Sequence, residues 1–133
     1  RSLVGSRQMC IRDRRKHLGL MPPEPVQHAM AVALGDDEHV AAQKELYRGR
    51  RDILRPALEA AGFRIDGSEA GLYLWATEGQ DAWTSIERLA DLGILAGPGP
   101  FYGAFSNEHV RLALTAPSER IAEGARRLRE QAV

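Results

Sequence analysis

The sequence has little of several features that would identify a function on their own. Its 133 residues include one cysteine, Cys10, which excludes an intrachain disulfide and a metal site built from several cysteines. No apolar run approaches the roughly 20 residues that a membrane-spanning helix needs. Basic and acidic side chains balance at 18 each, so bulk charge gives no support for binding nucleic acid or an anionic membrane. With no recognisable signal peptide, we expect a cytoplasmic protein with neither kind of partner.

The familiar catalytic and metal-binding patterns are missing as well. No two histidines have the i, i+4 spacing of a zinc helix, and no serine lies in a G-x-S-x-G elbow. The glycines of residues 97–103 are followed by an expected strand rather than a helix, so they favour a tight turn over a phosphate-binding loop. Carboxylates fall at expected helix ends and turns, where capping explains them. We therefore assign no metal site. The histidines are His17, His28, His39 and His109.

The composition is that of a globular domain, with 44% hydrophobic and 27% charged residues. A chain of this length can form one domain with a substantial hydrophobic core. Residues 1–14 differ from the rest, because they lack helical or strand periodicity and 8–14 (QMCIRDR) resembles translated sequencing-adapter read-through. We expect 1–14 to be a non-native segment and the remainder to be part of a longer protein. A basic arm that binds nucleic acid is the alternative for this segment.

The first half of the chain predicts two helices. Pro25 suits the first turn of a short helix over 26–34, which Gly35 would end. Asp36 would cap a long helix that reaches residue 61, because apolar residues recur every seven positions along it. Pro56 lies inside that helix, where a proline removes one hydrogen bond, so we expect a kink or a restart nearby.

The second half predicts short strands alternating with helices. We expect strands at 63–65, 72–77, 93–95 and 107–115, and helices over 81–92 and from Pro117 to the end. The strand at 72–77 is dense in aromatic and branched residues, which indicates burial on both faces. The predicted fold class is therefore α/β of the α+β kind, a small, mostly antiparallel sheet with helices packed on one side.

Arg111 is the most informative single residue of the chain. Strand alternation puts it on the face opposite Val110 and Leu112, within an apolar segment where an unpaired arginine is uncommon. Its planar fork suits a carboxylate, yet the residues alone favour an ion pair with a surface acid. Phe101 and Tyr102 cannot both pack beneath their glycine-flanked turn, and such loops often bind ligands. Tyr73 and Trp75 are interpreted as core residues.

Three segments together resemble a known family. Residues 71–77 (GLYLWAT), 93–103 (GILAGPGPFYG) and 109–115 (HVRLALT), followed by a closing helix, are similar to the C-terminal end of class I/II pyridoxal-phosphate-dependent aminotransferases of fold type I. Residues 15–21 (RKHLGLM) and 25–27 resemble the end of their large domain. The resemblance therefore covers 15–133. Within the family, the sequence is most similar to actinobacterial succinyldiaminopimelate transaminases. It implies that 15–35 is the tail of the large domain and that 36–133 is the small domain with the interdomain helix.

The resemblance also implies roles for particular residues. Arg111 matches the arginine that binds the substrate α-carboxylate, and Tyr102 is a further candidate contact near the substrate entrance. The Schiff-base lysine of the family lies in a serine-rich motif that surrounds neither Lys16 nor Lys44, so no catalytic residue is assigned. Pyridoxal 5'-phosphate would be held mainly by the large domain, so no cofactor-binding residue is assigned either. We expect the chain alone to be inactive.

The function expected by resemblance is transfer of an amino group between an amino acid and a 2-oxo acid. The family subgroup suggests N-succinyldiaminopimelate and 2-oxoglutarate as the substrates, in lysine and diaminopimelate biosynthesis, with a homodimer as the complete enzyme. Two alternatives stay open: another class I/II aminotransferase, and a non-catalytic α/β module that binds an amino acid through Arg111.

Overall fold

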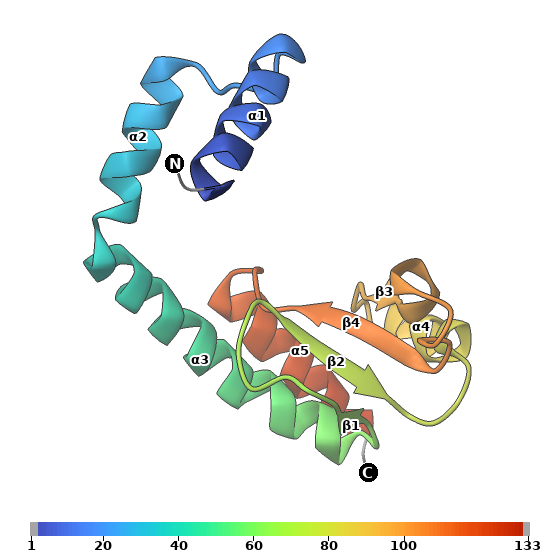
Figure 1. Cartoon of the computed structure of the whole chain (residues 1–133). Coiled ribbons are helices and arrows are strands. Elements are labelled where there is room, and N and C mark those ends of the chain that lie inside the picture. Colours follow the sequence, from blue (N-terminus) through green and yellow to red (C-terminus); the bar gives the residue numbers. More distant parts are fainter. Residues whose placement is uncertain (1–2, 132–133) are drawn as a thin grey trace. The chain divides into compact units, whose positions relative to one another are not determined.

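The structure, a computed structural model, describes residues 3–131, and its contacts divide the chain into two units between Val40 and Ala41 (Figure 1). The first unit holds helix α1 (Leu3–His17) and helix α2 (Glu24–Leu34). Residues 3–14 therefore form a helix although their sequence shows no helical periodicity, because arginine and methionine are good helix formers. Gly19, with φ of 68°, follows the end of α1. No residue of α2 is buried.

Helix α3 (Asp37–Ala60) leads into the second unit. The Asp36 side chain caps it by accepting hydrogen bonds from the backbone N–H groups of Glu38 and His39. The helix runs through Pro56 as one uninterrupted element, so the expected restart is absent. Leu54 and Leu58, which are buried on either side of Pro56, hold both turns against the core.

Four short strands form one antiparallel sheet. Their order is β1 (Arg64–Ile65), β2 (Tyr73–Thr77), β4 (His109–Ala113) and β3 (Gly97–Pro98), and every neighbouring pair is antiparallel. This confirms the predicted sheet, and Figure 1 shows β2 and β4 as its long central pair.

The strand expected at 93–95 is displaced to Gly97–Pro98. Gly93 has φ of 68°, and the Ile94 N–H donates to the Leu89 carbonyl at 2.8 Å. These residues therefore close the end of helix α4 (Ala82–Asp91), and pairing with β4 begins only at Gly97.

The remaining elements complete the second unit. Asp81 caps α4 by accepting from the Trp83 N–H at 2.9 Å. A single 3-10 turn, η1 (Gly99–Tyr102), joins β3 to the loop before β4. Helix α5 (Ser118–Gln131) follows Pro117, as expected.

The core lies on one face of the sheet. Leu74 and Ala76 of β2 share that face with Val110 and Leu112 of β4, and all four are buried. Three helices cover this face with Leu54, Ala57 and Leu58 from α3, Ala82 and Leu89 from α4, and Ile121, Ala125 and Leu128 from α5. The alternation predicted around Arg111 is confirmed by the burial pattern of β4. Burial of β2 on both faces is not, because no helix or strand of the second unit covers its other face.

The surface of α5 predicts a pH dependence. Glu123 bonds Arg126 and Arg127, and these hydrogen bonds, the one from Arg126 first, lower the pKa of its carboxyl from 4.5 to about 2. The stabilisation is then complete above about pH 4.5 and is lost as the pH falls toward 2. We expect Glu123→Gln to lower the melting temperature at pH 6 and to have little effect at pH 2.5, as followed by circular dichroism.

Glu119→Gln is the matched control for this experiment. It removes a carboxylate from the first turn of the same helix, where no ion pair is found among the described residues. A melting-temperature difference for Glu123→Gln that stays constant from pH 6 to pH 2.5 would contradict the assignment.

Candidate substrate-binding site

Arg111 lies in the middle of β4, on the face of the sheet opposite the one that α3, α4 and α5 cover. Its backbone pairs with Trp75 of β2 on one side and with Gly97 of β3 on the other. The side chain is half-buried. The sheet therefore holds Arg111 by two neighbouring strands and presents its side chain on the open face.

Two tyrosine rings pack against the Arg111 guanidinium. Its carbon lies 4.1 Å from the ring centroid of Tyr73 and 4.7 Å from that of Tyr102. Both distances are within the range of cation–π attraction. The interpretation of Tyr73 as a core residue is therefore wrong: it is 39% exposed, and Trp75 beside it is half-buried. Because their face of the sheet is uncovered, these rings pack on Arg111 and its neighbours instead.

The Arg111 side chain has unused hydrogen-bonding capacity. Within residues 3–131 no carboxylate lies at ion-pair distance from it, and its Nε is buried without a hydrogen-bond partner. Arg51 Nε is likewise buried without a partner, but Arg51 Nη2 donates to the Gly71 carbonyl, and Arg50 donates to that of Leu114. A buried donor left unpaired costs about 1–3 kcal/mol, which a bound carboxylate would offset.

Tyr102 reaches Arg111 because of the shape of the glycine turn. A Cβ atom on Gly97 would lie 3.2 Å from the Tyr102 hydroxyl and 3.8 Å from Arg111 Nε, so glycine leaves room for both. Tyr102 is 48% exposed and Phe101 is 72% exposed. This confirms that the two rings do not both pack beneath the turn. Phe101 instead meets Trp83 of α4, with ring centroids 5.9 Å apart.

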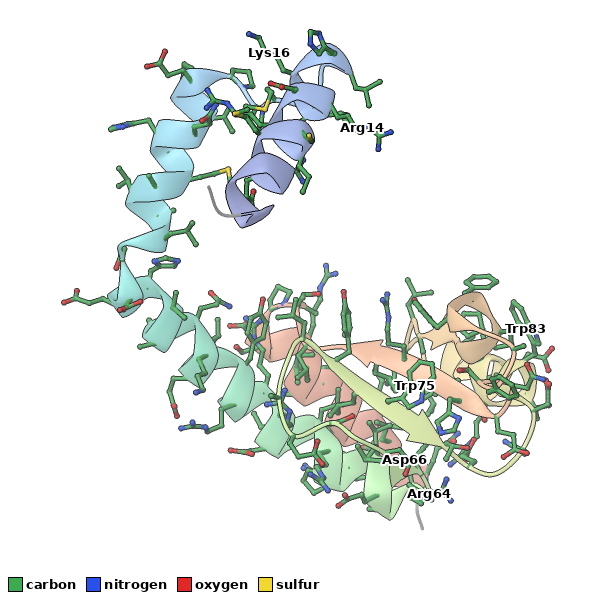
Figure 2. All side chains as sticks on the ribbon, in the orientation of Figure 1. Arg14, Lys16, Arg64, Asp66, Trp75 and Trp83 are labelled. Atoms are coloured by element: carbon green, nitrogen blue, oxygen red, sulfur yellow. The ribbon has the colours of Figure 1, made fainter. Side chains whose placement is uncertain are left out.

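A second group of side chains lies beside this pair. Trp75 meets Tyr102 at 84° with ring centroids 5.8 Å apart, and it stacks on His109 at 5.2 Å and 10°. His109 Nε2 lies 3.0 Å from the Asp66 carboxylate, which also bonds Arg64. Figure 2 shows Arg64 and Asp66 together near β1, with Trp75 on the adjacent strand. The sequence placed His109 on the same face as Arg111, but no signal linked Asp66 to it.

No group of metal-ligating side chains occurs among the described residues. His17, His28 and His39 are exposed on helices, as are Lys16 and Lys44. A hollow of about 600 Å³ lies between α5 and residues 93–95, but neither Arg111 nor Tyr102 lines it.

No helix among the described residues is both long enough and apolar enough to cross a lipid bilayer.

The chain matches the family model for aminotransferases of class I and II over residues 8–128. It is 55% identical over 114 residues to a 4-dedimethylamino-4-oxo-anhydrotetracycline transaminase of Streptomyces rimosus, covering 86% of this chain and 32% of that protein. It is 37% identical over 108 residues to the LL-diaminopimelate aminotransferase of Aquifex aeolicus, covering 78% and 28%.

Solved structures give the same picture of the fold. A "probable N-succinyldiaminopimelate aminotransferase" of Thermus thermophilus superposes with a TM-score of 0.62 at 32% identity, over 74% of this chain and 27% of that one. An aminotransferase of Staphylococcus aureus gives 0.65 at 28% identity, over 76% and 28%. The aromatic aminotransferase of Pyrococcus horikoshii gives 0.69 at 21% identity, over 79% and 30%, which supports the fold alone.

The matches cover only part of each relative, and they include part of the N-terminal segment. The chain spans about a third of the length of these relatives. The family match begins at Gln8, inside the segment that we expected to be non-native, and that interpretation stays a prediction.

The turn that carries Tyr102 predicts the effect of one substitution. A Cβ atom on Gly99 would overlap the carbonyl oxygens of Ser106 and His109, both of them backbone atoms that cannot rotate away. We expect Gly99→Ala to displace η1 and to lower the free energy of unfolding by about 1–3 kcal/mol, measured by urea denaturation.

Gly49→Ala provides the comparison. Gly49 lies inside helix α3 with nothing near its Cβ position, so alanine there is expected to stabilise the helix by roughly 0.5–1 kcal/mol. Equal free energies of unfolding for Gly99→Ala and the unsubstituted protein would show that the turn tolerates a side chain.

Proposed function

The chain belongs to the class I and II aminotransferase family, and we propose that the complete protein transfers an amino group between an amino acid and a 2-oxo acid. The family match over most of the chain supports a transferase. Members of this family generally depend on pyridoxal phosphate, which carries the amino group between the two substrates when it is bound.

The environment of the Arg111 side chain is the main evidence for this proposal. Its guanidinium packs against two tyrosine rings, and its Nε is buried with no protein acceptor among the described residues. Both substrates of a transaminase carry a carboxylate, which a guanidinium binds through two parallel hydrogen bonds. We assign Arg111 to the substrate α-carboxylate and Tyr102, which packs on it, to the same pocket.

The geometry of this pair accounts for orientation as well as affinity. Two hydrogen bonds to one guanidinium fix the plane of the carboxylate, which limits how the rest of the substrate can point. The aromatic rings exclude water from the guanidinium faces, and a charged hydrogen bond is stronger where less water competes for it. Arg111 would bind and orient the substrate without taking part in bond breaking.

The described residues do not fit the cofactor itself. The open face around Arg111 presents aromatic rings and one guanidinium, and the only lysine of the second unit, Lys44, is exposed on α3. Residues 97–103 form a strand end and a 3-10 turn that lead to β4, and no helix begins there to bind a phosphate. We therefore propose that pyridoxal phosphate and its lysine belong to the large domain of the complete enzyme, so that this chain alone is inactive.

N-succinyldiaminopimelate with 2-oxoglutarate is the proposed substrate pair, in lysine and diaminopimelate biosynthesis. The similarity to LL-diaminopimelate aminotransferases and to the Thermus structure supports this choice. The alternative is another aminotransferase of the family, and the 55% identity to the Streptomyces rimosus transaminase favours a ketone of the anhydrotetracycline type for that alternative.

The complete enzyme is proposed to be a cytoplasmic homodimer that acts on small molecules. The apolar side chains of α2 are exposed in this chain, which is consistent with further protein covering them in the assembled enzyme.

Substitution of Arg111 tests the proposal. In the complete protein, Arg111→Lys keeps the charge but loses the planar fork, so we expect KM for the amino-acid substrate to rise about 10- to 100-fold. The assay follows transamination of N-succinyldiaminopimelate with 2-oxoglutarate, and the same enzyme is tested with LL-diaminopimelate.

Arg120→Lys serves as the control, because Arg120 is exposed on α5 and away from the open face of the sheet. An unchanged KM in Arg111→Lys would exclude the proposed role. Tight binding of the amino acid by the complete protein without any turnover would instead favour the non-catalytic binding module.

A further inference from the structure

The two rings that pack on Arg111 are held in different ways. Tyr73 belongs to β2, and its backbone pairs with Ala113 of β4, so the sheet fixes it. Tyr102 belongs to the 3-10 turn η1, outside the sheet, and is 48% exposed. The position of the Tyr102 ring therefore depends on the side chains that it touches.

Trp75 is the side chain that supports Tyr102. The two rings are nearly perpendicular, at 84°, with centroids 5.8 Å apart, a favourable arrangement for an aromatic pair. Trp75 is also the cross-strand neighbour of Arg111, because the two residues pair between β2 and β4. A displacement of the Trp75 indole would move the ring that covers Arg111.

His109 and Asp66 hold the indole side chain of Trp75 in place. The imidazole of His109 lies parallel to the indole at 5.2 Å. Its Nε2 lies 3.0 Å from Asp66 Oδ2, and Asp66 also accepts two hydrogen bonds from Arg64, at 2.9 and 3.0 Å. The imidazole is therefore fixed at one end by a carboxylate that is itself held in place.

The turn that contains Asp66 also holds Trp75 by its backbone. The Asp66 N–H donates to the Trp75 carbonyl at 2.9 Å, and the Trp75 N–H donates to Ser68 Oγ at 2.9 Å. Ser68 Oγ in turn donates to the Asp66 carbonyl at 3.0 Å. One turn thus fixes both the backbone of Trp75 and, through His109, its indole.

The charge on Asp66 sets the direction of its contact with His109. Hydrogen bonds from Arg64, and then from His109, hold the pKa of the Asp66 carboxyl well below its usual range, so Asp66 is an acceptor at neutral pH. His109 Nε2, 3.0 Å away, donates to it. This hydrogen bond therefore ties one end of the imidazole to Asp66.

We propose that His109 and Asp66 are positioning residues that hold Trp75 and Tyr102 against Arg111 and so set the affinity of the site for a carboxylate. This inference rests on the proposed function of Arg111. Neither residue touches the substrate in this account; both act through the indole of Trp75.

Binding of succinate to the complete protein tests the proposal without turnover. Succinate is an unreactive dicarboxylate, and its dissociation constant is measured by isothermal titration calorimetry. Because an aromatic pair contributes about 0.5–1.5 kcal/mol, His109→Ala, which removes the ring, is expected to weaken binding about three- to tenfold. Asp66→Ala and His109→Phe both keep a ring on Trp75 but lose the hydrogen bond that anchors it, so each should weaken binding by a smaller factor of about two to three.

Further measurements and variants distinguish a positioning role of His109 and Asp66 from a general loss of protein stability. KM for the amino-acid substrate should rise by the same factor as the dissociation constant, while kcat changes less, and Asp91→Ala, which removes an exposed acid from α4, should change neither. In an Arg111→Lys background, His109→Ala should cause no further loss, because both act on one contact. If an alanine variant does not fold, Asp66→Asn replaces it, with an expected loss of about two- to threefold.

The outcomes distinguish this inference from the proposed function. If Arg111→Lys weakens succinate binding but the Asp66 and His109 variants bind normally, the positioning role is wrong and the function of Arg111 stands. If Arg111→Lys binds succinate normally, the proposed function itself fails. Equal losses in His109→Phe and His109→Ala would also overturn the inference, since the ring would then not be what matters.

Discussion

The proposed site depends on one arginine, which the sheet holds with an unpaired nitrogen on the face that α3, α4 and α5 do not cover. Backbone pairing with β2 and with β3 fixes the backbone of Arg111 on both sides, so its backbone needs no further ordering when a ligand binds. Its Nε is buried and has no partner within residues 3–131, and two tyrosine rings cover the guanidinium. A bound carboxylate would satisfy this group and remove the cost of leaving it unpaired.

In the second unit, the helices pack on only one face of the sheet. Helices α3, α4 and α5 all bury their apolar residues on the Leu74 and Val110 side. Strand alternation then puts every second side chain of β2 and β4 on the other side, where aromatic rings and His109 surround the arginine. The hydrophobic core and the proposed binding site thus use opposite faces of the same two strands.

Much of this arrangement was predictable from local sequence, because it depends on short-range periodicity. The alternation around Arg111, the antiparallel sheet and the exposure of Phe101 and Tyr102 all followed from residues close together in the chain. Tyr73 and Trp75 were misplaced in the core, because aromatic content cannot say which face of a strand a neighbouring element covers. Asp66 and His109 are 43 positions apart, so their contact depends on strand pairing that no local pattern encodes.

The family relation and the geometry together make Arg111 the residue on which the account depends. The most direct measurement is a crystal structure of the complete protein with succinate bound. The account predicts that the two oxygens of one succinate carboxylate lie within about 2.7–3.0 Å of the Arg111 guanidinium nitrogens, beside the Tyr102 ring. It would be contradicted if a protein carboxylate occupied Arg111 and succinate bound elsewhere.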